Sequence, residues 1–236
     1  MSGAGEGERP LRRVAVFDLD RTITRLPSYT PFLLSTLRGR PLSQLSACAA
    51  TLPWLLGYLL KTVSRAAVKE RMLRLTLAGQ PREEVEKQAR RFVTAWLEGG
   101  LRPAARDVCT RHSKAGDQLM LATASFDFYA GLFAEGLGFD SLVATLSSWS
   151  PEGRLLARLD GANCYGEEKL RRVQKALPWP RETCYVIAYS DHHSDLPLLG
   201  WADEGVAVNP SRRLAEAAKA QGLRIADWDR PDDEGY

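Results

Sequence analysis

The chain of 236 residues contains little cysteine and little histidine. Its four cysteines stand far apart with no Cys-x-x-Cys pair, and only three histidines are present. This spacing excludes a zinc-finger site and a dense disulfide framework, because both need clustered ligands or clustered thiols. The pattern is typical of a cytoplasmic protein whose thiols stay reduced and mostly buried: Cys48, Cys109, Cys164 and Cys184.

Neither sign of charge is in large excess over the whole chain. Thirty-two Lys and Arg against 29 Asp and Glu leave a net charge of +3, which argues against a dedicated nucleic-acid binder. Residues 1–10 lack the apolar run of a secretory signal, and we expect a disordered tail there. The acidic, proline-containing stretch 229–236 predicts a second, frayed tail.

Four short apolar runs predict the strands of a parallel sheet. They are Val14–Phe17, Gln118–Ala122, Cys184–Ala188 and Gly205–Val208. Continuous apolar runs are typical of strands that are buried on both faces. Helical stretches between them, such as Glu167–Leu177 and Ser211–Gln221, supply the crossovers. The predicted fold class is therefore α/β, with a doubly wound parallel sheet.

The first two strands are separated by about a hundred residues, which is too long for a simple crossover. Apolar residues there repeat with the period of an amphipathic helix: Val85, Ala89, Phe92, Val93 and Trp96. We predict an all-helical cap over residues 25–102, inserted between core segments 11–24 and 103–228. This cap holds thirteen Lys and Arg against five Glu, a net +8, which leaves −5 for the rest of the chain.

Residues 41–60 contain no charged side chain, and a helix of this length would be about as long as a bilayer core is thick. Its leucines recur on one helical face: Leu42, Leu45, Leu52, Leu56 and Leu59. Basic residues flank it: Arg38, Arg40, Lys61 and Arg65. Three interpretations stay open, namely packing in the cap core, peripheral contact of 41–65 with an anionic membrane, and a membrane span, against which Pro53 counts.

Two carboxylates, Asp18 and Asp20, follow the first strand in Asp18-Leu-Asp-Arg-Thr22. Ligands of open parallel sheets bind beyond the carboxyl ends of the strands, so both side chains can point into one crevice. Paired carboxylates can hold a hard divalent cation, or act as nucleophile and acid/base. Capping of a strand-to-loop turn is the alternative.

Three further polar motifs follow in order. Thr123 comes after the second apolar run, where a hydroxyl and main-chain N–H groups can bind phosphate or cap a helix. Lys169 opens a helix, where it can neutralise phosphate or be a surface lysine. Asp191 and Asp195 follow the third run and can complete a metal site. Three of the four motifs stand at strand ends, which favours one shared site.

This ordered set resembles the haloacid dehalogenase-like phosphatase superfamily, in its phosphoserine-phosphatase-like branch. The motifs that carry the resemblance are Asp18-Leu-Asp-Arg-Thr22, Cys164-Tyr-Gly-Glu-Glu-Lys169, Tyr189-Ser-Asp191 with Asp195, and Val206-Ala-Val-Asn-Pro210. With the cap, they are similar to a bacterial group that includes phosphatidylglycerophosphatase C-type enzymes. The resemblance implies a Rossmann-like core, a small helical cap, and Mg²⁺-dependent phosphoryl transfer through an aspartyl-phosphate.

The resemblance also implies roles for single residues. Asp18 would be the nucleophile and Asp20 the general acid/base. Asp18, the backbone carbonyl of Asp20, and Asp191 would bind Mg²⁺. Thr123 and Lys169 would hold the phosphoryl oxygens.

Asp195 would support Lys169 or a water bound to the metal. Other positions depart from the family pattern. Arg21 stands where a small residue is usual, and either adds an anion contact or crowds the substrate. We interpret His192 and His193 as loop residues, with His192 a candidate substrate contact at the rim. Phosphoserine phosphatases carry a glutamate near the position of Pro27, and its absence argues against phosphoserine.

The predicted function is a Mg²⁺-dependent phosphomonoester hydrolase. A lipid or lipid-precursor phosphate at the inner face of the membrane is one substrate class, because the basic charge and the uncharged stretch share a segment. A cytoplasmic phosphatase of a phosphorylated small molecule such as phosphoserine is the alternative. A non-catalytic membrane- or partner-binding protein on a phosphatase scaffold is the third, and the intact acids and Lys169 argue against it.

Overall fold

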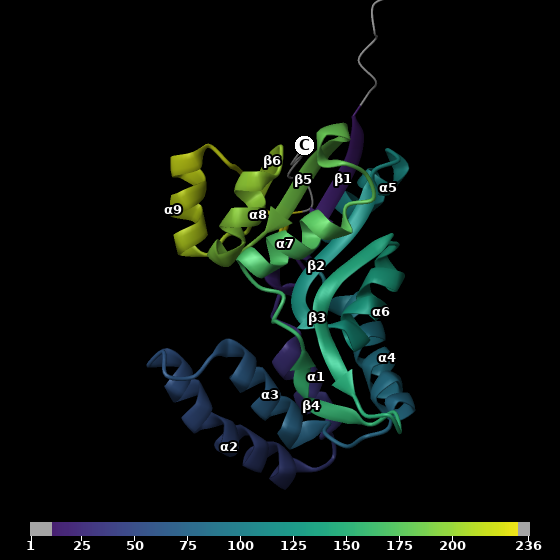
Figure 1. Ribbon diagram of the computed structural model, residues 1–236, viewed down its shortest axis with the longest axis vertical. Helices are drawn as coiled ribbons and strands as arrows, with labels where there is room; N and C mark the ends of the chain where they lie inside the picture. Colours follow the sequence, from purple (N-terminus) through teal and green to yellow (C-terminus); the bar gives the residue numbers. More distant parts are fainter. Residues whose placement is uncertain (1–10, 231–236) are drawn as a thin grey trace, which may run out of the picture.

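The computed structural model describes residues 11–230, built on one seven-stranded sheet (Figure 1). The strand order is β4-β3-β2-β1-β5-β6-β7. The strands are β1 (Arg12–Phe17), β2 (Gln118–Phe126), β3 (Ser141–Trp149), β4 (Leu155–Asp160), β5 (Cys184–Ser190), β6 (Glu204–Val208) and β7 (Arg224–Ala226). Neighbours pair in parallel except β3 and β4. The predicted Rossmann-like α/β fold is confirmed, and the antiparallel edge strand β4 is an addition to it.

Helices cover both faces of the sheet. They are α1 (Tyr29–Thr36), α2 (Pro41–Leu59), α3 (Arg65–Thr76), α4 (Arg82–Gly99), α5 (Ala105–Lys114), α6 (Asp127–Leu137), α7 (Glu167–Ala176), α8 (Leu196–Trp201) and α9 (Arg212–Gln221). Side chains of β1 alternate between the two cores: Ala15 and Phe17 pack with α4, α5 and α6, whereas Val14 and Val16 pack with α7, α8 and α9. Burial on both faces is why β1 is a continuous apolar run.

The segment between β1 and β2 is helical, as its periodicity predicts: α1 to α4 lie within residues 25–102, and α5 follows them. Val85, Ala89 and Val93 of α4 are buried against the core. In Figure 1 α2 and α3 form the lower end of the molecule, and the β3–β4 hairpin extends toward them. The hairpin joins this segment through main-chain hydrogen bonds, from Gly79 N to Leu155 O (2.8 Å) and from Leu155 N to Gln80 O (3.0 Å). A division into core and cap at residues 25–102 stays a prediction.

The leucine face of α2 is exposed to solvent. Leu42 is 81% exposed and Leu59 is 75% exposed, whereas Ala47 and Thr51 on the other face are buried. The interpretation of this face as buried cap core is therefore wrong, because its leucines are exposed although α2 packs against α3. Across the described part of the chain, no helix combines the length and the apolar character that crossing a membrane requires.

Of the two predicted tails, only Asp229 and Arg230 belong to the described residues. Asp229 accepts a hydrogen bond from Arg102 at 2.5 Å, and Arg230 pairs with Asp227 at 3.3 Å. The frayed tail over residues 229–236 stays a prediction. Residues 1–10 and 231–236 lie outside the described part. All four cysteines are free, and Cys48 alone of them is exposed.

Candidate active site

The carboxyl ends of β1, β2 and β5 border one cavity of about 450 Å³. All but one of the residues predicted for the site line it: Asp18, Asp20, Arg21, Lys169, Asp191, His192 and Asp195. The inserted helices complete the wall with side chains from α1, α2 and α3, including Tyr29, Leu55, Tyr58, Arg65 and Lys69. Residues far apart in the sequence thus meet where the parallel sheet brings strand ends together.

Lys169 is a buried cation that lines this cavity. Its Nζ donates to Asp18 Oδ1 at 2.8 Å and to Asp195 Oδ2 at 2.6 Å, and the residue is 2% exposed. Burial by itself lowers the pKa of this lysine, but the facing charges of Asp18 and Asp195 outweigh it and raise the pKa above its usual range. Ser190 Oγ donates to the same oxygen of Asp195 at 2.7 Å and fixes that carboxylate.

Asp18 and Asp191 carry perturbed carboxyl groups. The pKa of Asp18 is raised to about 7 and that of Asp191 to about 6. Burial is the main cause and the charge of Asp195 adds to it, while Lys169 opposes the rise. Thr22 lies between them: its hydroxyl is 3.3 Å from Asp18 Oδ2 and 3.4 Å from Asp191 Oδ1, and it accepts the Asp191 N–H at 2.9 Å. Buried carboxylates therefore outnumber the buried lysine, and a cation would balance them.

The donor set around Asp18 and Asp191 consists of oxygen atoms, the type that Mg²⁺ prefers. Within residues 11–230 no three His, Cys, Asp or Glu side chains form a cluster suited to a metal ion. The set predicted from the resemblance uses two side-chain carboxylates and the main-chain carbonyl of Asp20, so it does not require such a cluster. The residues present fit a magnesium ion by charge and by donor type.

Asp20 is held by a network that the sequence did not predict. It accepts hydrogen bonds from Ser28 N at 2.5 Å and from Ser125 Oγ at 2.7 Å. Tyr129 donates to Ser125 at 2.5 Å and accepts from Ser28 Oγ at 3.3 Å. The sequence could have indicated Ser125 as a site residue, because it stands close to Thr123 at a strand end. Nothing in the sequence marked Ser28 or Tyr129 as site residues.

Thr123 is the predicted residue that does not line the cavity. It is fully buried, and its hydroxyl accepts the N–H of Ser125 at 3.0 Å. Ala124 and Ser125, the next two residues, line the cavity instead. Its predicted role in holding phosphate stays a prediction.

Lys69 of α3 is a second buried lysine, 7% exposed, that the sequence did not single out. Its Nζ donates to Ala124 O at 2.6 Å and to Asn163 Oδ1 at 2.9 Å, and lies 4.4 Å from the ring centre of Phe126. Its pKa is lowered to about 7, mainly by burial and also by the nearby charge of Arg65. Lys69 thus joins α3 to the end of β2 beside the predicted phosphate site.

Arg21 and His192 stand at the edge of the cavity. Arg21 has a left-handed backbone (φ 65°), and its carbonyl accepts from Arg102 Nε at 2.8 Å. The charge of Arg21 lowers the pKa of Asp191. Burial lowers the pKa of His192 to about 4, so its ring is neutral at pH 7, and its Nδ1 lies 2.9 Å from Ser194 Oγ.

Comparison with known proteins identifies the family. The family model for haloacid dehalogenase-like hydrolases matches residues 15–200. The chain belongs to this family. It is 34% identical over 199 residues to the protein CicA of Caulobacter vibrioides, which covers 84% of this chain and 86% of CicA.

One further relative bears on the enzyme class, and solved structures bear on the fold. A histidinol-phosphatase of Neisseria meningitidis is 28% identical over 156 residues, covering 64% of this chain and 70% of that protein. The crystal structure of a Bordetella pertussis protein of unknown function matches with a TM-score of 0.84 at 30% identity, over 92% of this chain and 99% of that one. Solved phosphoserine phosphatases share the fold at 13–18% identity. The predicted phosphatase of this family is confirmed at this level.

Proposed function

We propose that this protein is a Mg²⁺-dependent phosphomonoester hydrolase that works through a phosphorylated Asp18. The observation that carries the proposal is Lys169, buried between Asp18 and Asp195 in a cavity that Asp20 and Asp191 also line. An enzyme that transfers a phosphoryl group must neutralise its charge and position a nucleophile. The cavity holds the Asp18 carboxylate and the Lys169 ammonium 2.8 Å apart, which suits these two tasks.

The proposed reaction has two displacements at phosphorus. Asp18 attacks the phosphorus, a bond forms from its carboxylate oxygen, and the ester P–O bond breaks as Asp20 donates a proton to the leaving oxygen. Asp20 then takes a proton from water, whose oxygen attacks the same phosphorus and releases phosphate from Asp18. Lys169 holds the phosphoryl oxygens throughout. Mg²⁺, bound by Asp18, the Asp20 carbonyl and Asp191, would supply further positive charge.

The exposed face of helix α2 supports the proposal that the substrate is a phosphate ester with an apolar part. Its leucine face is exposed, while Leu55 and Tyr58 of the same helix line the catalytic cavity. No acidic residue occurs from position 21 to 69, so an anionic surface would meet no like charge there. We therefore include in the proposal peripheral contact of residues 41–65 with the inner face of an anionic membrane, and a lipid or lipid-precursor phosphate as substrate.

The test is release of phosphate from a panel of phosphomonoesters by the purified chain with Mg²⁺. The panel combines soluble esters, including histidinol phosphate and phosphoserine, with lipid phosphates dispersed in detergent. Asp18→Asn is the blank, because it keeps the shape of the side chain and removes the nucleophile. We expect turnover by the wild type alone and its loss with a chelator. Equal turnover by the variant would refute the role of Asp18, and preference for a soluble ester would refute the lipid substrate.

A further inference from the structure

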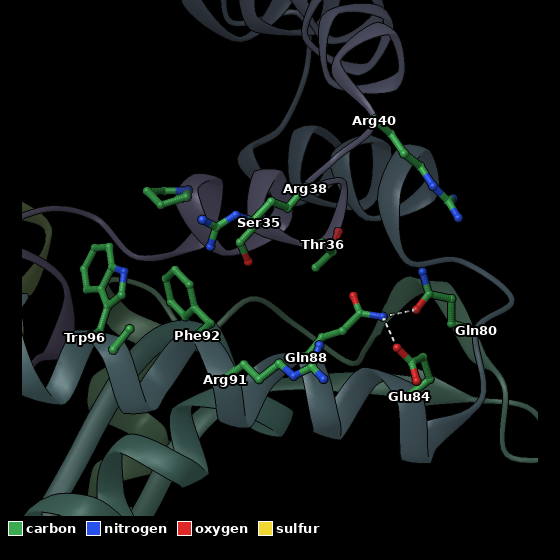
Figure 2. A pocket seen from close by; sticks show the side chains of 12 residues that line it. Ser35, Thr36, Arg38, Arg40, Gln80, Glu84, Gln88, Arg91, Phe92 and Trp96 are labelled. Carbon is green, nitrogen blue, oxygen red and sulfur yellow. Dashed lines mark hydrogen bonds between the residues drawn. The ribbon is translucent and has the colours of Figure 1, made fainter.

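A second cavity lies away from the catalytic one, between α1 and α4 (Figure 2). It measures about 770 Å³. Arg38 and Arg40 follow α1 on one side, and Gln88, Arg91 and the aromatic pair Phe92 and Trp96 of α4 line the other. We call this cavity the α1–α4 cleft.

The α1–α4 cleft carries an excess of positive charge. Arg38, Arg40 and Arg91 line it against one acid, Glu84. None of the three arginines forms an ion pair within the part of the chain that the structure describes, residues 11–230. Glu84 instead accepts from Gln88 Nε2 at 3.0 Å and lies 3.9 Å from Lys87 Nζ. Unpaired guanidinium groups around one cavity favour an anion with several oxygen atoms, such as phosphate.

Gln88 adds a requirement for a hydrogen-bond donor. Its amide nitrogen donates to Gln80 Oε1 at 2.9 Å and to Glu84 Oε1 at 3.0 Å. Its carbonyl oxygen is buried and has no donor among the described residues, and Figure 2 shows it directed into the cleft. Buried acceptors are rarely left without a donor, so a ligand with a hydroxyl or N–H group would complete this site.

Helix α1 separates the two cavities. Tyr29 and Thr30 line the catalytic cavity, whereas Ser35 and Thr36 line the cleft. Phe32 lies between them, fully buried, with its ring 5.3 Å from that of Phe92. The cleft is therefore a site of its own and not an extension of the catalytic cavity.

We propose that the α1–α4 cleft binds a phosphate ester that carries hydroxyl groups, with the phosphate at Arg91 and a hydroxyl at Gln88 of the same helix. Arg38 and Arg40 add positive charge at separate points of the rim. This chemistry has two sources, a soluble metabolite or the headgroup of an anionic phospholipid. The second source is available because the exposed leucines of α2 begin at Leu42, two residues after Arg40. The proposal does not depend on hydrolysis at Asp18.

Binding is tested with a probe that a phosphomonoesterase does not cleave. Glycerophosphoglycerol, a soluble phosphodiester with free hydroxyls, is titrated into the wild-type chain by calorimetry. Vesicles of phosphatidylglycerol, with phosphatidylcholine vesicles as reference, form the second arm. The cleft variant is Arg38→Ala with Arg91→Ala. The matched control, Arg74→Ala with Arg90→Ala, removes the same charge from exposed positions of α3 and α4 outside the cleft.

We expect the cleft variant to bind its probe at least roughly tenfold more weakly than the wild type, because it loses hydrogen bonds to charged guanidinium groups. The control variant should bind the probe as the wild type does. Gln88→Leu should also weaken the soluble probe. A loss confined to vesicles assigns the site to lipid headgroups, and a loss with the soluble diester assigns it to a metabolite. No binding of either probe, or equal loss in both double variants, would overturn the proposal. Both double variants should hydrolyse a small soluble phosphomonoester as the wild type does. This readout distinguishes failure of the cleft proposal from failure of the proposed reaction at Asp18.

Discussion

At the scale of single residues, the buried charges of the cavity depend on Lys169. Its removal leaves Asp18 and Asp195 in a buried site without a cation, and breaking a buried pair in this way costs about 3–5 kcal/mol. We expect Lys169→Met to lose hydrolysis and to unfold at a lower denaturant concentration, as measured by circular dichroism. Lys175→Met, exposed near the other end of α7, is the control. Equal stability of the two variants would contradict the charge balance described for the site.

Ser125 is a positioning residue for Asp20, which it contacts at 2.7 Å. Ser125→Ala leaves Asp20 with the hydrogen bond from Ser28 N alone and lets it turn away from the leaving oxygen. General acid catalysis typically contributes about 10²–10⁴-fold, so we expect kcat to fall by roughly tenfold or more while KM changes little. Ser113→Ala, exposed on α5, is the control. Steady-state kinetics measures both constants, and a change in KM alone would assign Ser125 to substrate binding instead.

Lys69 gives the folded state a pH dependence of known sign. Its folded pKa of about 7 lies below the ordinary value of 10.5, so between these values the unfolded chain holds a proton that the folded chain lacks. Stability from this group therefore rises with pH across that window, by up to about 1.4 kcal/mol per pH unit. We expect the free energy of unfolding of wild type relative to Lys69→Met to increase from pH 7 to 9 in urea titrations.

Lys61→Met is the matched control for Lys69→Met, because Lys61 is exposed at the end of α2. Its stability should follow the wild type at each pH. If Lys69→Met also follows the wild type, Lys69 is charged and solvated in the folded chain, contrary to its burial and contacts.

At the scale of elements, α2 presents a leucine face that nothing in residues 11–230 covers. Leu45→Ser with Leu56→Ser removes two of its exposed side chains. Because burying one leucine contributes roughly 1.5–3 kcal/mol, we expect binding to phosphatidylglycerol vesicles to fall more than about tenfold in flotation assays. Leu146→Ser with Ile225→Ser, also exposed but outside α2, should bind as the wild type does. Equal flotation of the two double variants would exclude α2 as the membrane contact.

The elements differ in how far the sequence predicted them. Strands β1, β2, β5 and β6 are continuous apolar runs, because both of their faces are buried. Strands β3 and β4 escaped prediction because their runs are not continuously apolar and buried: β3, for example, contains the exposed Leu146 and the polar Ser147. β4 is the edge strand of the sheet, and β3 lies next to it. The orientation of α2 was also open, because periodicity shows which side chains share a face but not whether another element covers it.

For the site as well, the sequence predicted the residues that a local pattern marks and missed those that only packing brings together. Asp18, Lys169 and Asp191 stand at strand ends or helix starts in a spacing that implies a shared crevice, and the fold brings them together. Lys69 could not be recognised, because a lysine among many basic residues of a helix is most often exposed. Its burial results from the packing of α3 against the end of β2, which no local pattern encodes.

At the scale of the whole molecule, the β3–β4 hairpin ties the inserted helices to the sheet through Leu155, which is fully buried. Leu155→Ala should cost about 2–5 kcal/mol. It should also speed amide exchange at Gly79 and at residue 155 itself, because these two N–H groups donate the main-chain hydrogen bonds between the loop and the hairpin. Leu156→Ala, on the other side of the strand and half-buried, should cost less and leave that exchange slow. Hydrogen exchange followed by mass spectrometry measures both, and equal exchange would show that the hairpin does not hold this loop.

This tie affects how the insertion can be exchanged between relatives. Residues 79–82 bond to the hairpin at Gly153 and Leu155, and Leu159 N donates to Glu70 of α3 at 2.9 Å. A chimera that replaces residues 25–102 alone would separate these partners. The transferable module therefore consists of two stretches, 25–102 and 150–160. Substitutions that change substrate choice in one stretch should need compensating substitutions in the other.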